Sequence, residues 1–400
     1  MKVICDRGGL LGAINLVSRA VAGRTPRVQL TCIKLTASKP AGKGGGELVL
    51  SATDAEVAIK IALTNVDVQQ SGEALVLADK LKAIVAAEDA EPTLTIEVTQ
   101  EKCHIRGRDA HFTLLGYAPA DFPPIPDFAD VIAGTRGQQT PKTTFTQLAS
   151  GLAMLVERTI FATARETSRY AINGVLLKRD GRRVEMVATD GRRLALCRGT
   201  VTGGGGGEKE APFNCIIPSK ALSLIRDLAR DPEETVAVAV TDNQAFFAFG
   251  SGLGKDAAPP RAVLISNLVE GTFPPYEDVI PKDSDRKVVF DRDLVKSAVS
   301  RAALLTNEES RGVRMRFSKA DKQLELSSRA PEMGEAELRV DLRSYEGEDL
   351  EIGFNPLFIT DALKVIQETE VVMELKDAKR PGVVRSGNDF LYVVMPVSLA

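Results

Sequence analysis

The stretch FTQLASGLAMLVERTIFAT, residues 145–163, decides the fold because its pattern occurs three times in the chain. It begins with alternating, strand-like residues and continues as an amphipathic helix with apolar side chains at helical spacing. DRGGLLGAINLVSRAV at residues 6–21 and FDRDLVKSAVSRAALLT at residues 290–306 have the same form. Each copy is followed by β-branched, glycine-punctuated sequence typical of antiparallel strands. A long-period recurrence of this kind predicts a repeat architecture.

A second helix follows in each copy, in residues 77–98, 217–240 and 354–375, and runs directly into a strand with period-two alternation. The first two copies also end alike, on an apolar strand followed by Phe-Pro-Pro. The shared order predicts an α+β chain of three repeated units of roughly 130 residues each. The predicted domains are residues 1–128, 141–276 and 282–400, with proline-rich linkers near 119–142 and 270–287, and the glycine runs at 42–46 and 203–207 are predicted to be flexible loop tips.

The triplet Ala-Thr-Asp occurs in LSATDAEVAI, residues 50–59, and again in MVATDGRRLA, residues 186–195. Its two carboxylates, Asp54 and Asp190, could be a catalytic pair, two metal ligands or a marker of the repeat. They fall at equivalent places in the first two copies, and Thr-Asp-Gly at a strand end is more often a turn whose side chain bonds its own backbone. We therefore predict two turns, whereas an enzyme that used both carboxylates would need them close together.

The composition is that of a globular protein with substantial cores, at 44% hydrophobic and 26% charged residues. A net charge of −3 excludes a general basic field that would attract nucleic acid or an anionic membrane. Five cysteines without a CxxC pair disfavour a disulfide framework and a zinc site and favour a cytoplasmic location. The N-terminal segment is interpreted as an amphipathic helix rather than a signal peptide, and no stretch is apolar enough to span a bilayer.

Motifs for catalysis are incomplete or missing. GSGLGKD, residues 250–256, has one residue too few between its outer glycines for a phosphate loop and lacks Ser or Thr after Lys255, so we interpret it as a hairpin turn. His104 and His111, the only histidines, are placed seven apart on one predicted strand. That placement directs them to opposite faces and excludes a shared metal or an acid/base pair. The sequence thus predicts a protein that is not an enzyme and uses no metal or cofactor.

The helices of the repeats carry Lys and Arg on the side opposite their apolar stripe. Arg292, Lys296 and Ser300, for example, recur at intervals of four residues. These faces could line a weakly positive surface or be ordinary solvated helix faces, and the pattern alone favours the second interpretation. The predicted apolar sides are Leu222, Leu224, Ile225 and Leu228 in one helix and Leu294, Val295, Ala298 and Val299 in another.

The segment RYAINGVLLKRDGRRVEMVATDGRRLALC, residues 169–197, resembles the bacterial sliding clamps, the beta subunits of DNA polymerase III. The resemblance extends over the whole chain. It implies two copies in a head-to-tail ring, with antiparallel sheets outside, helices lining the hole and duplex DNA passing through it. A clamp-like paralogue that serves only as a partner-binding scaffold is an alternative. Further matching stretches are AGRTP at 22–26, FPPYEDVIPK at 273–282, SRAALLTNEESRGVRM at 300–315, LEIGFN at 350–355 and YVVMP at 392–396.

The implied function is a non-catalytic processivity factor for DNA polymerase. A ring holds DNA by topology, so its affinity need not come from many phosphate contacts. The weak net charge of the chain is compatible with this way of holding DNA. The resemblance places DNA contacts at Arg24 and Lys220, and it favours the positive-surface interpretation of the helix faces. The residues expected to face DNA are Arg24, Lys220, Arg226, Arg292 and Lys296.

The resemblance also implies a pocket between the second and third domains. Short motifs from the polymerase catalytic subunit, the clamp loader, other polymerases and repair proteins would bind there. Asp278 stands where a basic residue is common, and the ending Val397-Ser398-Leu399-Ala400 departs from the frequent Met-Arg-Leu, so the peptide preference is expected to differ. The implied lining is Arg169, Ile172, Thr189, Gly191, Arg192, Arg193, Leu194, Pro274, Asp278, Val279, Asn355, Phe358, Val393, Met395 and Pro396, most of which would otherwise be interpreted as core residues.

The implied dimer contact joins the first domain of one copy to the third domain of the other. Phe112 is expected to pack on Leu304 and Leu305. Charged residues would surround this apolar contact, with the rim ion pairs contributing little. The rim consists of Lys80 and His111 facing Glu332 and Glu335, with Asp109 at a position that is often basic in the family.

Overall fold

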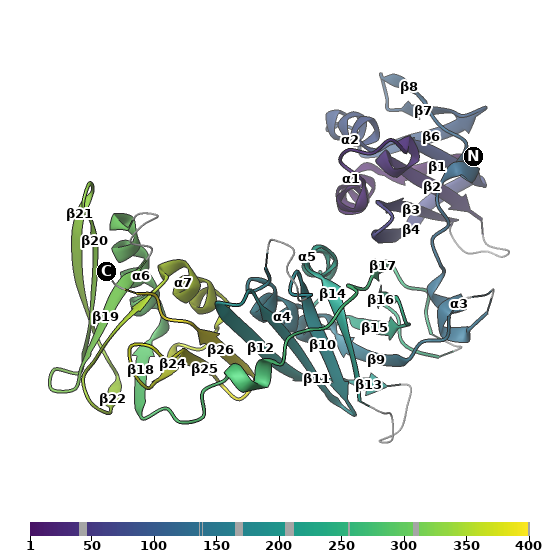
Figure 1. Ribbon diagram of the computed structural model, residues 1–400. Helices are drawn as coiled ribbons and strands as arrows, with labels where there is room; N and C mark the ends of the chain where they lie inside the picture. The colour runs from purple at the N-terminus through teal and green to yellow at the C-terminus, as the bar shows by residue number, and fades with distance from the viewer. Residues whose placement is uncertain are drawn as a thin grey trace. The chain divides into compact units, whose positions relative to one another are not determined.

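The computed structural model describes residues 1–39, 46–135, 137, 139–164, 171–204, 212–254, 257–306 and 312–398. Within these residues the chain is α+β, with seven α-helices and sheets of thirteen, nine and four strands (Figure 1). Each sheet is built from antiparallel pairs, such as β3 (Gly46–Thr53) with β4 (Val57–Gln70), β11 (Arg183–Thr189) with β12 (Arg193–Thr200) and β20 (Gln323–Ala330) with β21 (Gly334–Asp341). No helix in the described part is both long and apolar enough to cross a membrane. The predicted α+β class with antiparallel sheets is confirmed.

The chain packs as two compact units. The first comprises residues 1–153, 201–213 and 220–268, and the second comprises 154–200, 214–219 and 269–400. This division follows the sheets rather than the order of the sequence. In the first unit β17 (Ala262–Asn267) pairs with β4 (Val57–Gln70), and in the second β12 (Arg193–Thr200) pairs with β26 (Phe390–Val394). The middle repeat therefore contributes strands to both units.

The thirteen-stranded sheet belongs to the first unit. Beside β4 and β17 its strands are β1 (Lys2–Asp6), β2 (Cys32–Ser38), β3 (Gly46–Thr53), β5 (Gly72–Leu77), β6 (Thr93–Thr99), β7 (Lys102–Arg106), β8 (His111–Leu115), β9 (Thr143–Leu148), β13 (Gly203–Gly204), β15 (Thr235–Val240) and β16 (Gln244–Phe249). The helices along this part of the chain are α1 (Arg7–Val17), α2 (Ala78–Ala87), α3 (Phe128–Ala133) and α5 (Ser219–Leu228).

The nine- and four-stranded sheets lie in the second unit. The nine-stranded sheet holds β10 (Gly174–Asp180), β11 (Arg183–Thr189), β12, β14 (Phe213–Pro218), β18 (Arg286–Asp291), β22 (Ser344–Glu346), β24 (Glu370–Leu375), β25 (Gly382–Ser386) and β26. The four-stranded sheet holds β19 (Val313–Ser318), β20 (Gln323–Ala330), β21 (Gly334–Asp341) and β23 (Leu350–Phe354). The helices here are α6 (Arg292–Ala302) and α7 (Pro356–Val365), while α4 (Ala149–Ile160) begins in the first unit and ends in the second.

The recurring strand-to-helix junctions begin with a capping side chain. Asp6 accepts a hydrogen bond from the amide of Gly9, and Asp291 accepts from the amides of Asp293 and Leu294. Asn355 caps α7 in the same way, and Pro356 follows in the first turn, where its missing N–H costs nothing. Short polar residues at the strand ends thus start the helices α1, α6 and α7.

The apolar faces of the helices agree with the predicted spacing at all but one position. In α5 the residues Leu222, Leu224, Ile225 and Leu228 are buried, as predicted. In α6 the prediction that Leu294 faces inward is wrong, since its side chain is 55% exposed. The buried stripe is Val295, Ala298, Val299 and Ala302, which leaves Leu294 at the margin of the stripe in the first turn.

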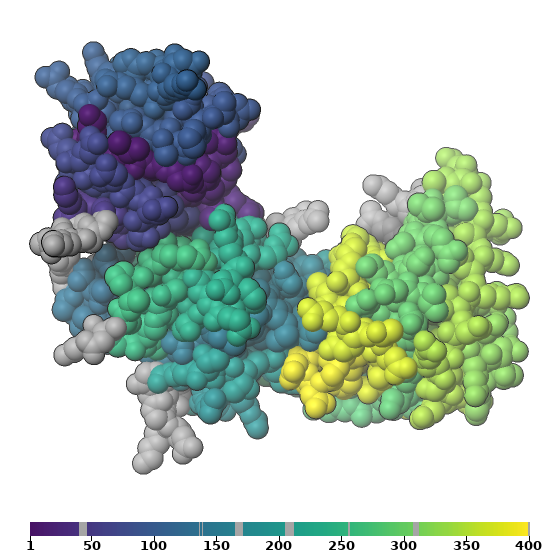
Figure 2. All heavy atoms as spheres, turned by 180° about the vertical axis from the view of Figure 1, so that it is seen from behind, coloured from purple at the N-terminus to yellow at the C-terminus, as the bar shows by residue number. Residues whose placement is uncertain are grey.

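The two histidines do not lie on one strand. The amide of Gly107 donates to the carbonyl of Ala110 and folds the chain into the β7–β8 hairpin. His104 in β7 and His111 in β8 therefore face each other, with 3.3 Å between Nδ1 of His104 and Nε2 of His111. The predicted placement on opposite faces is wrong. Figure 1 shows the hairpin, and its blue segment lies on the surface in Figure 2.

Two predicted loops have structure of their own. Gly250–Gly254 follow β16 in the connection to β17, and these two strands pair antiparallel. The interpretation of this stretch as part of a hairpin is therefore confirmed for Gly250–Gly254. Lys255 and Asp256 lie outside the described residues. The second glycine run is not wholly a loop tip, because Gly203 and Gly204 form β13 on β9. Gly46 likewise belongs to β3. The remaining members of both runs lie outside the described residues.

Candidate functional site

The turn between β11 and β12 holds Asp190 through its own backbone. The Asp190 carboxylate accepts from the amides of Arg192 and Arg193, at 3.0 and 3.1 Å. The Thr189 hydroxyl donates to the carbonyl of Arg193 at 2.7 Å and accepts from the amide of Gly191. Gly191 has φ +85°, a conformation that favours glycine. The side chains of Thr189 and Asp190 therefore build the turn that the sequence predicts.

The turn between β3 and β4 repeats this pattern. The Asp54 carboxylate accepts from the amides of Glu56 and Val57, at 2.9 and 2.8 Å, and the Thr53 hydroxyl donates to the carbonyl of Val57. Asp54 also pairs with Lys220 of the same unit. Burial raises the pKa of Asp54, but the hydrogen bonds from Lys220 and the two amides outweigh burial and lower it. Both Ala-Thr-Asp triplets are thus turn scaffolds in which each carboxylate already has its own partners.

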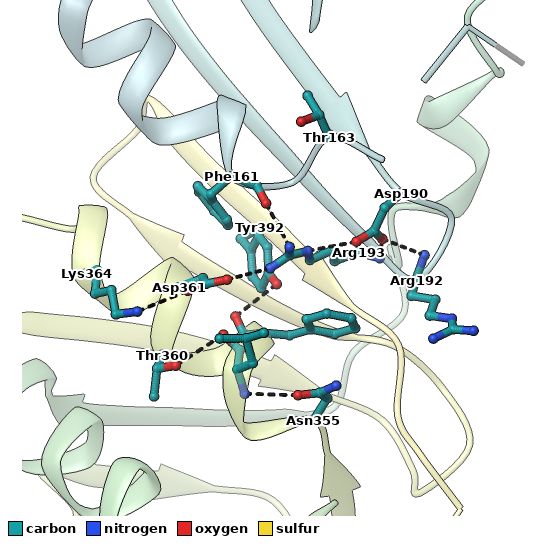
Figure 3. A network of polar contacts seen from close by, with 12 residues as sticks. Phe161, Thr163, Asp190, Arg192, Arg193, Asn355, Thr360, Asp361, Lys364 and Tyr392 are labelled. Atoms are coloured by element: carbon teal, nitrogen blue, oxygen red, sulfur yellow. Dashed lines mark hydrogen bonds and ion pairs between the residues drawn. The ribbon is translucent and has the colours of Figure 1, made fainter. Parts of the chain in front are cut away.

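The two turns differ in the residue that closes them, which is Val57 in one and Arg193 in the other. The Arg193 side chain is 9% exposed, and its Nε donates to Asp190 at 2.9 Å while Nη1 donates to Asp361 of α7 at 3.0 Å (Figure 3). Its Nη2 donates to the carbonyl of Phe161 at 2.7 Å. One guanidinium therefore ties the β11–β12 turn to the end of α4 and to α7, all within the second unit.

Aromatic rings complete this cluster. The guanidinium carbon of Arg193 lies 4.4 Å from the ring centre of Phe358 and 5.6 Å from that of Phe161. The Tyr392 hydroxyl donates to the Phe358 carbonyl at 2.9 Å. Burial lowers the pKa of Arg193, but the hydrogen bond to Asp361 and the nearby Tyr392 and Asp190 side chains outweigh burial and raise it above its usual value. Arg193 is thus a fixed cation with a structural role.

The predicted pocket residues divide into buried and exposed members. Leu194 and Val393 are direct cross-strand partners, 2% and 3% exposed, in the same core cluster as Tyr276. Of the other predicted pocket residues, Met395 is 42% exposed and Val279 is 50% exposed. Ile172 and Thr189 are also buried, Asn355, Phe358, Pro274 and Pro396 are half-buried, Gly191, Arg192 and Asp278 are exposed, and Arg169 lies outside the described residues.

The C-terminal segment is fixed by backbone hydrogen bonds. The amide of Met395 donates to the carbonyl of Arg192, and that of Val397 donates to the carbonyl of Gly353, both at 2.9 Å. The segment therefore runs from the Arg193 turn to β23, with Met395 beside the exposed Arg192. The guanidinium of Arg192 has no ion-pair partner among the described residues and points away from the cluster in Figure 3.

The short helix η4 (Tyr276–Val279) is anchored on the sheet by residues that the sequence did not single out. The Tyr276 hydroxyl donates to Glu185 at 2.5 Å and accepts from Lys178 at 2.9 Å, and Lys178 also reaches Glu277 at 3.0 Å. Burial and the hydrogen bond to Glu185 raise the pKa of Tyr276, so its hydroxyl remains a donor. The Phe-Pro-Pro-Tyr sequence that ends the second repeat was the sequence feature that could have pointed to Tyr276 as an anchor of this helix.

The residues expected to face DNA have different surroundings. Arg24 and Arg226 are exposed and have no ion-pair partner in the part of the chain that the structure describes, while Lys296 is half-buried. Lys220 pairs with Asp54. Arg292 donates to the carbonyls of Ile366 and Gln367 at 2.8 and 3.0 Å and pairs with Asp293, so its guanidinium holds the end of α7.

The residues expected at the dimer contact lie near the surface of both units. Leu304 is 72% exposed, and Phe112 and Leu305 are half-buried. Phe112 belongs to β8, which is an edge strand of its sheet. The expected rim residues Lys80, His111, Glu332 and Glu335 are exposed, and so is Asp109.

Comparisons with known proteins agree over the whole length. Family models of the DNA polymerase III beta subunit match residues 1–126 (N-terminal domain), 148–275 (central domain) and 277–398 (C-terminal domain). The chain is 31% identical to the beta sliding clamp of Pseudomonas putida and 29% identical to that of Escherichia coli, with 100% of each chain covered.

Solved structures give the same result. A sliding clamp of Pseudomonas aeruginosa bound to griselimycin, 30% identical, and the clamp of Bacillus subtilis, 26% identical, both superpose with a TM-score of 0.86 over 100% of each chain. The predicted fold of three repeated clamp domains is thereby confirmed. Within the described residues no group of three or more His, Cys, Asp or Glu side chains is placed to hold a metal ion. The chain belongs to the family of bacterial sliding clamps, the beta subunits of DNA polymerase III.

Proposed function

We propose that this chain is a DNA polymerase processivity factor that closes with a second copy into a head-to-tail ring around duplex DNA. The observation that carries the proposal is the succession of all three beta-subunit domains along the whole chain. The net charge of −3 supports retention by topology, because a protein that bound DNA through many phosphate contacts would carry a basic surface. The exposed cations Arg24 and Arg226 suffice for weak contacts that permit sliding.

Retention on circular DNA tests this proposal. The protein is loaded by a clamp loader onto a nicked plasmid, washed in high salt, and followed by gel filtration before and after a restriction enzyme linearises the plasmid. We expect the protein to stay on the circle in salt and to leave after linearisation. Release from the intact circle by salt alone would contradict the ring. A partner-binding scaffold would bind clamp-directed peptides without being retained on either DNA.

We further propose that partner proteins dock beside the Arg193 turn, on a surface defined by Arg192, Val279 and Met395. Val279 and Met395 are exposed apolar side chains. Val279 precedes Ile280, which packs against the core cluster that holds Leu194 and Val393, and Met395 follows Val393 by two residues. An exposed apolar patch with a polar rim is typical of a protein-binding surface, and methionine adapts to several partners. Short motifs with Leu or Phe anchors have the matching chemistry.

Peptide binding tests this docking surface. We expect Val279→Ala combined with Met395→Ala to weaken binding of a fluorescent clamp-directed peptide at least about tenfold, equivalent to ~1.4 kcal/mol. Leu294→Ala is the matched control, since Leu294 is 55% exposed on α6, away from these residues in the sequence. Equal affinities of the double variant and the control would contradict the proposed surface. Fluorescence polarisation gives the affinity of each variant.

The dimer contact is proposed to join Phe112 on the edge strand β8 to Leu304 and Leu305 of the second copy. Leu304 is 72% exposed, and Leu304→Ala removes apolar surface without leaving a cavity in one subunit. We expect light scattering after gel filtration to give a dimer for the native protein and a larger monomer fraction for the variant. A native monomer at all concentrations would contradict ring closure.

A further inference from the structure

All the histidine in this chain is gathered at one place. Of 400 residues only His104 and His111 are histidines, and they are diagonal neighbours on one face of the β7–β8 hairpin. Their nitrogens Nδ1 and Nε2 are 3.3 Å apart, and their ring centres are 5.3 Å apart. The Thr113 hydroxyl lies 3.0 Å from the same Nδ1 of His104. Three polar atoms thus meet at one point on the surface of the first unit.

The spacing of the two nitrogens matches the bite of a chelated metal ion. Imidazole nitrogens bind late first-row metals at about 2.0–2.1 Å. Two such bonds place the nitrogens ~3.3 Å apart at the tetrahedral angle of Zn²⁺ and ~2.9 Å apart at the right angle that Cu²⁺ and Ni²⁺ prefer. The observed 3.3 Å therefore lets one ion take the place of the hydrogen bond with little change in the hairpin. Each ring would keep its proton on the other nitrogen and bind the ion as a neutral imidazole.

The backbone holds both rings in place. In the hairpin register His104 is opposite Thr113, and Arg106 is opposite His111, so both imidazoles stand on one face of the sheet. Cys103 and Ile105, the neighbours of His104 on the other face, are 0% exposed and fix β7 against the core. Pre-positioned ligands on rigid strands reduce the entropy cost of binding a metal.

We propose that His104 and His111 form a bidentate site for a late first-row divalent ion of the Cu²⁺, Ni²⁺ or Zn²⁺ class. A site with only imidazole ligands suits these ions rather than Mg²⁺ or Ca²⁺, which take oxygen ligands. In the single chain His111 is exposed and His104 half-buried, which leaves the other coordination positions open to water there. Glu97, opposite His104 on β6, is held by Arg106 at 3.3 Å and is left out of the proposed ligand set.

Metal titration of the full chain without a histidine tag tests the site. After removal of bound metal with a chelator, calorimetric titration with Cu²⁺ is expected to give one ion per chain. Electron paramagnetic resonance is expected to show coupling to two nitrogens. His104→Asn and His111→Gln should each weaken binding at least about tenfold, the range expected when a metal site loses a supporting group. Unchanged affinity in either variant, or a spectrum with oxygen ligands only, would overturn the proposal.

A control variant and an NMR measurement test whether both histidine nitrogens bind the ion. Thr113→Val removes the hydroxyl beside His104 but leaves both nitrogens, so we expect it to bind Cu²⁺ with nearly native affinity. In a ¹⁵N spectrum of the imidazoles only two residues contribute, and Zn²⁺ should shift both together. A shift of one ring alone would contradict bidentate binding. Both ligands belong to one chain, so loss of Cu²⁺ binding and loss of the ring are separate outcomes, although His111 is also expected at the rim of the dimer contact.

Discussion

At the residue scale, the guanidinium of Arg193 is the group on which most contacts of the candidate site depend. It bonds Asp190, Asp361 and the Phe161 carbonyl while its side chain is only 9% exposed. The equivalent residue of the first repeat is Val57, which closes the same turn with its backbone alone. A single side chain thus converts a repeated turn into a connection between α4, β12 and α7.

Replacing Arg193 by alanine should destabilise the second unit strongly. The change leaves the half-buried Asp190 without its cation and takes from Asp361 one of its two cations, since Lys364 remains at 3.1 Å. Loss of one partner of a buried pair costs about 3 kcal/mol. The neighbouring Arg192→Ala is the matched control, because Arg192 is exposed and has no ion-pair partner among the described residues; its effect should stay within about 0.5 kcal/mol. Calorimetric melting compares the variants, and equal melting temperatures would show that the cluster does not hold the unit together.

The charge on Asp54 should make stability depend on pH. Its pKa is lowered in the folded protein by Lys220 and two amides, so its contribution is present above the unfolded value near ~4 and is lost as pH falls through the folded value. Asp54→Asn keeps an acceptor for the turn but removes the charge. We expect the melting temperature of this variant to lie below the native one above pH ~5, and the difference to close as pH falls through the lowered pKa of the folded protein. A gap that does not change with pH would mean that the charge is not involved.

At the element scale, the C-terminal segment is held by backbone hydrogen bonds, whereas the short helix η4 is held by side-chain contacts. Backbone bonds from Met395 and Val397 fix the C-terminal segment, whereas η4 depends on the side chain of Tyr276. The Tyr276 ring also belongs to the buried cluster around Leu194. The position of Val279 is therefore decided by Tyr276, three residues away on the same short helix.

Tyr276→Phe should loosen η4 while leaving the fold intact. The variant keeps the buried ring but loses the hydroxyl that bonds Glu185 and Lys178, at a cost of about 1–3 kcal/mol. We expect faster hydrogen exchange in the segment around 273–282 and weaker peptide binding. Glu277→Gln serves as the control, because it weakens the exposed pair with Lys178 but keeps the Tyr276 hydroxyl and its bond to Glu185. Unchanged exchange in this segment would show that packing of the ring alone positions η4.

At the scale of the whole molecule, the five cysteines are distributed over both compact units, so their reactivity can show whether either unit opens. All are buried, and none forms a disulfide. Burial raises the pKa of Cys5, Cys103 and Cys215 to about 12 and that of Cys197 to about 11. Only a thiolate reacts readily with alkylating reagents, so burial removes both access and reactivity.

We therefore expect the folded protein to resist iodoacetamide at pH 8, with five labels added per chain only after unfolding in guanidinium. Mass spectrometry counts the labels under the two conditions. Rapid labelling of Cys5 or Cys103 in the native protein would show that the first unit opens locally, and labelling of Cys197 would show the same for the second.

The sequence by itself determined the features that depend on neighbouring residues. The three repeats, the α+β class, the buried side of α5 and the two Thr-Asp turns all follow from periodicity or from bonds within five residues. These patterns are readable because helix and turn chemistry is local. The resemblance to clamps came from the same linear information, and the comparisons agree with it.

Only the tertiary structure decided which distant groups meet. Arg193 bonds Asp361, which is 168 residues away in the sequence. The strands of the middle repeat are divided between two compact units, because they pair with strands of both neighbouring repeats. The turn at Gly107 brought His104 and His111 together, although Gly-Arg-Asp-Ala was a readable hint of a hairpin. A side chain's partners across the fold are set by packing, because contacts between elements depend on register and burial that no local pattern encodes.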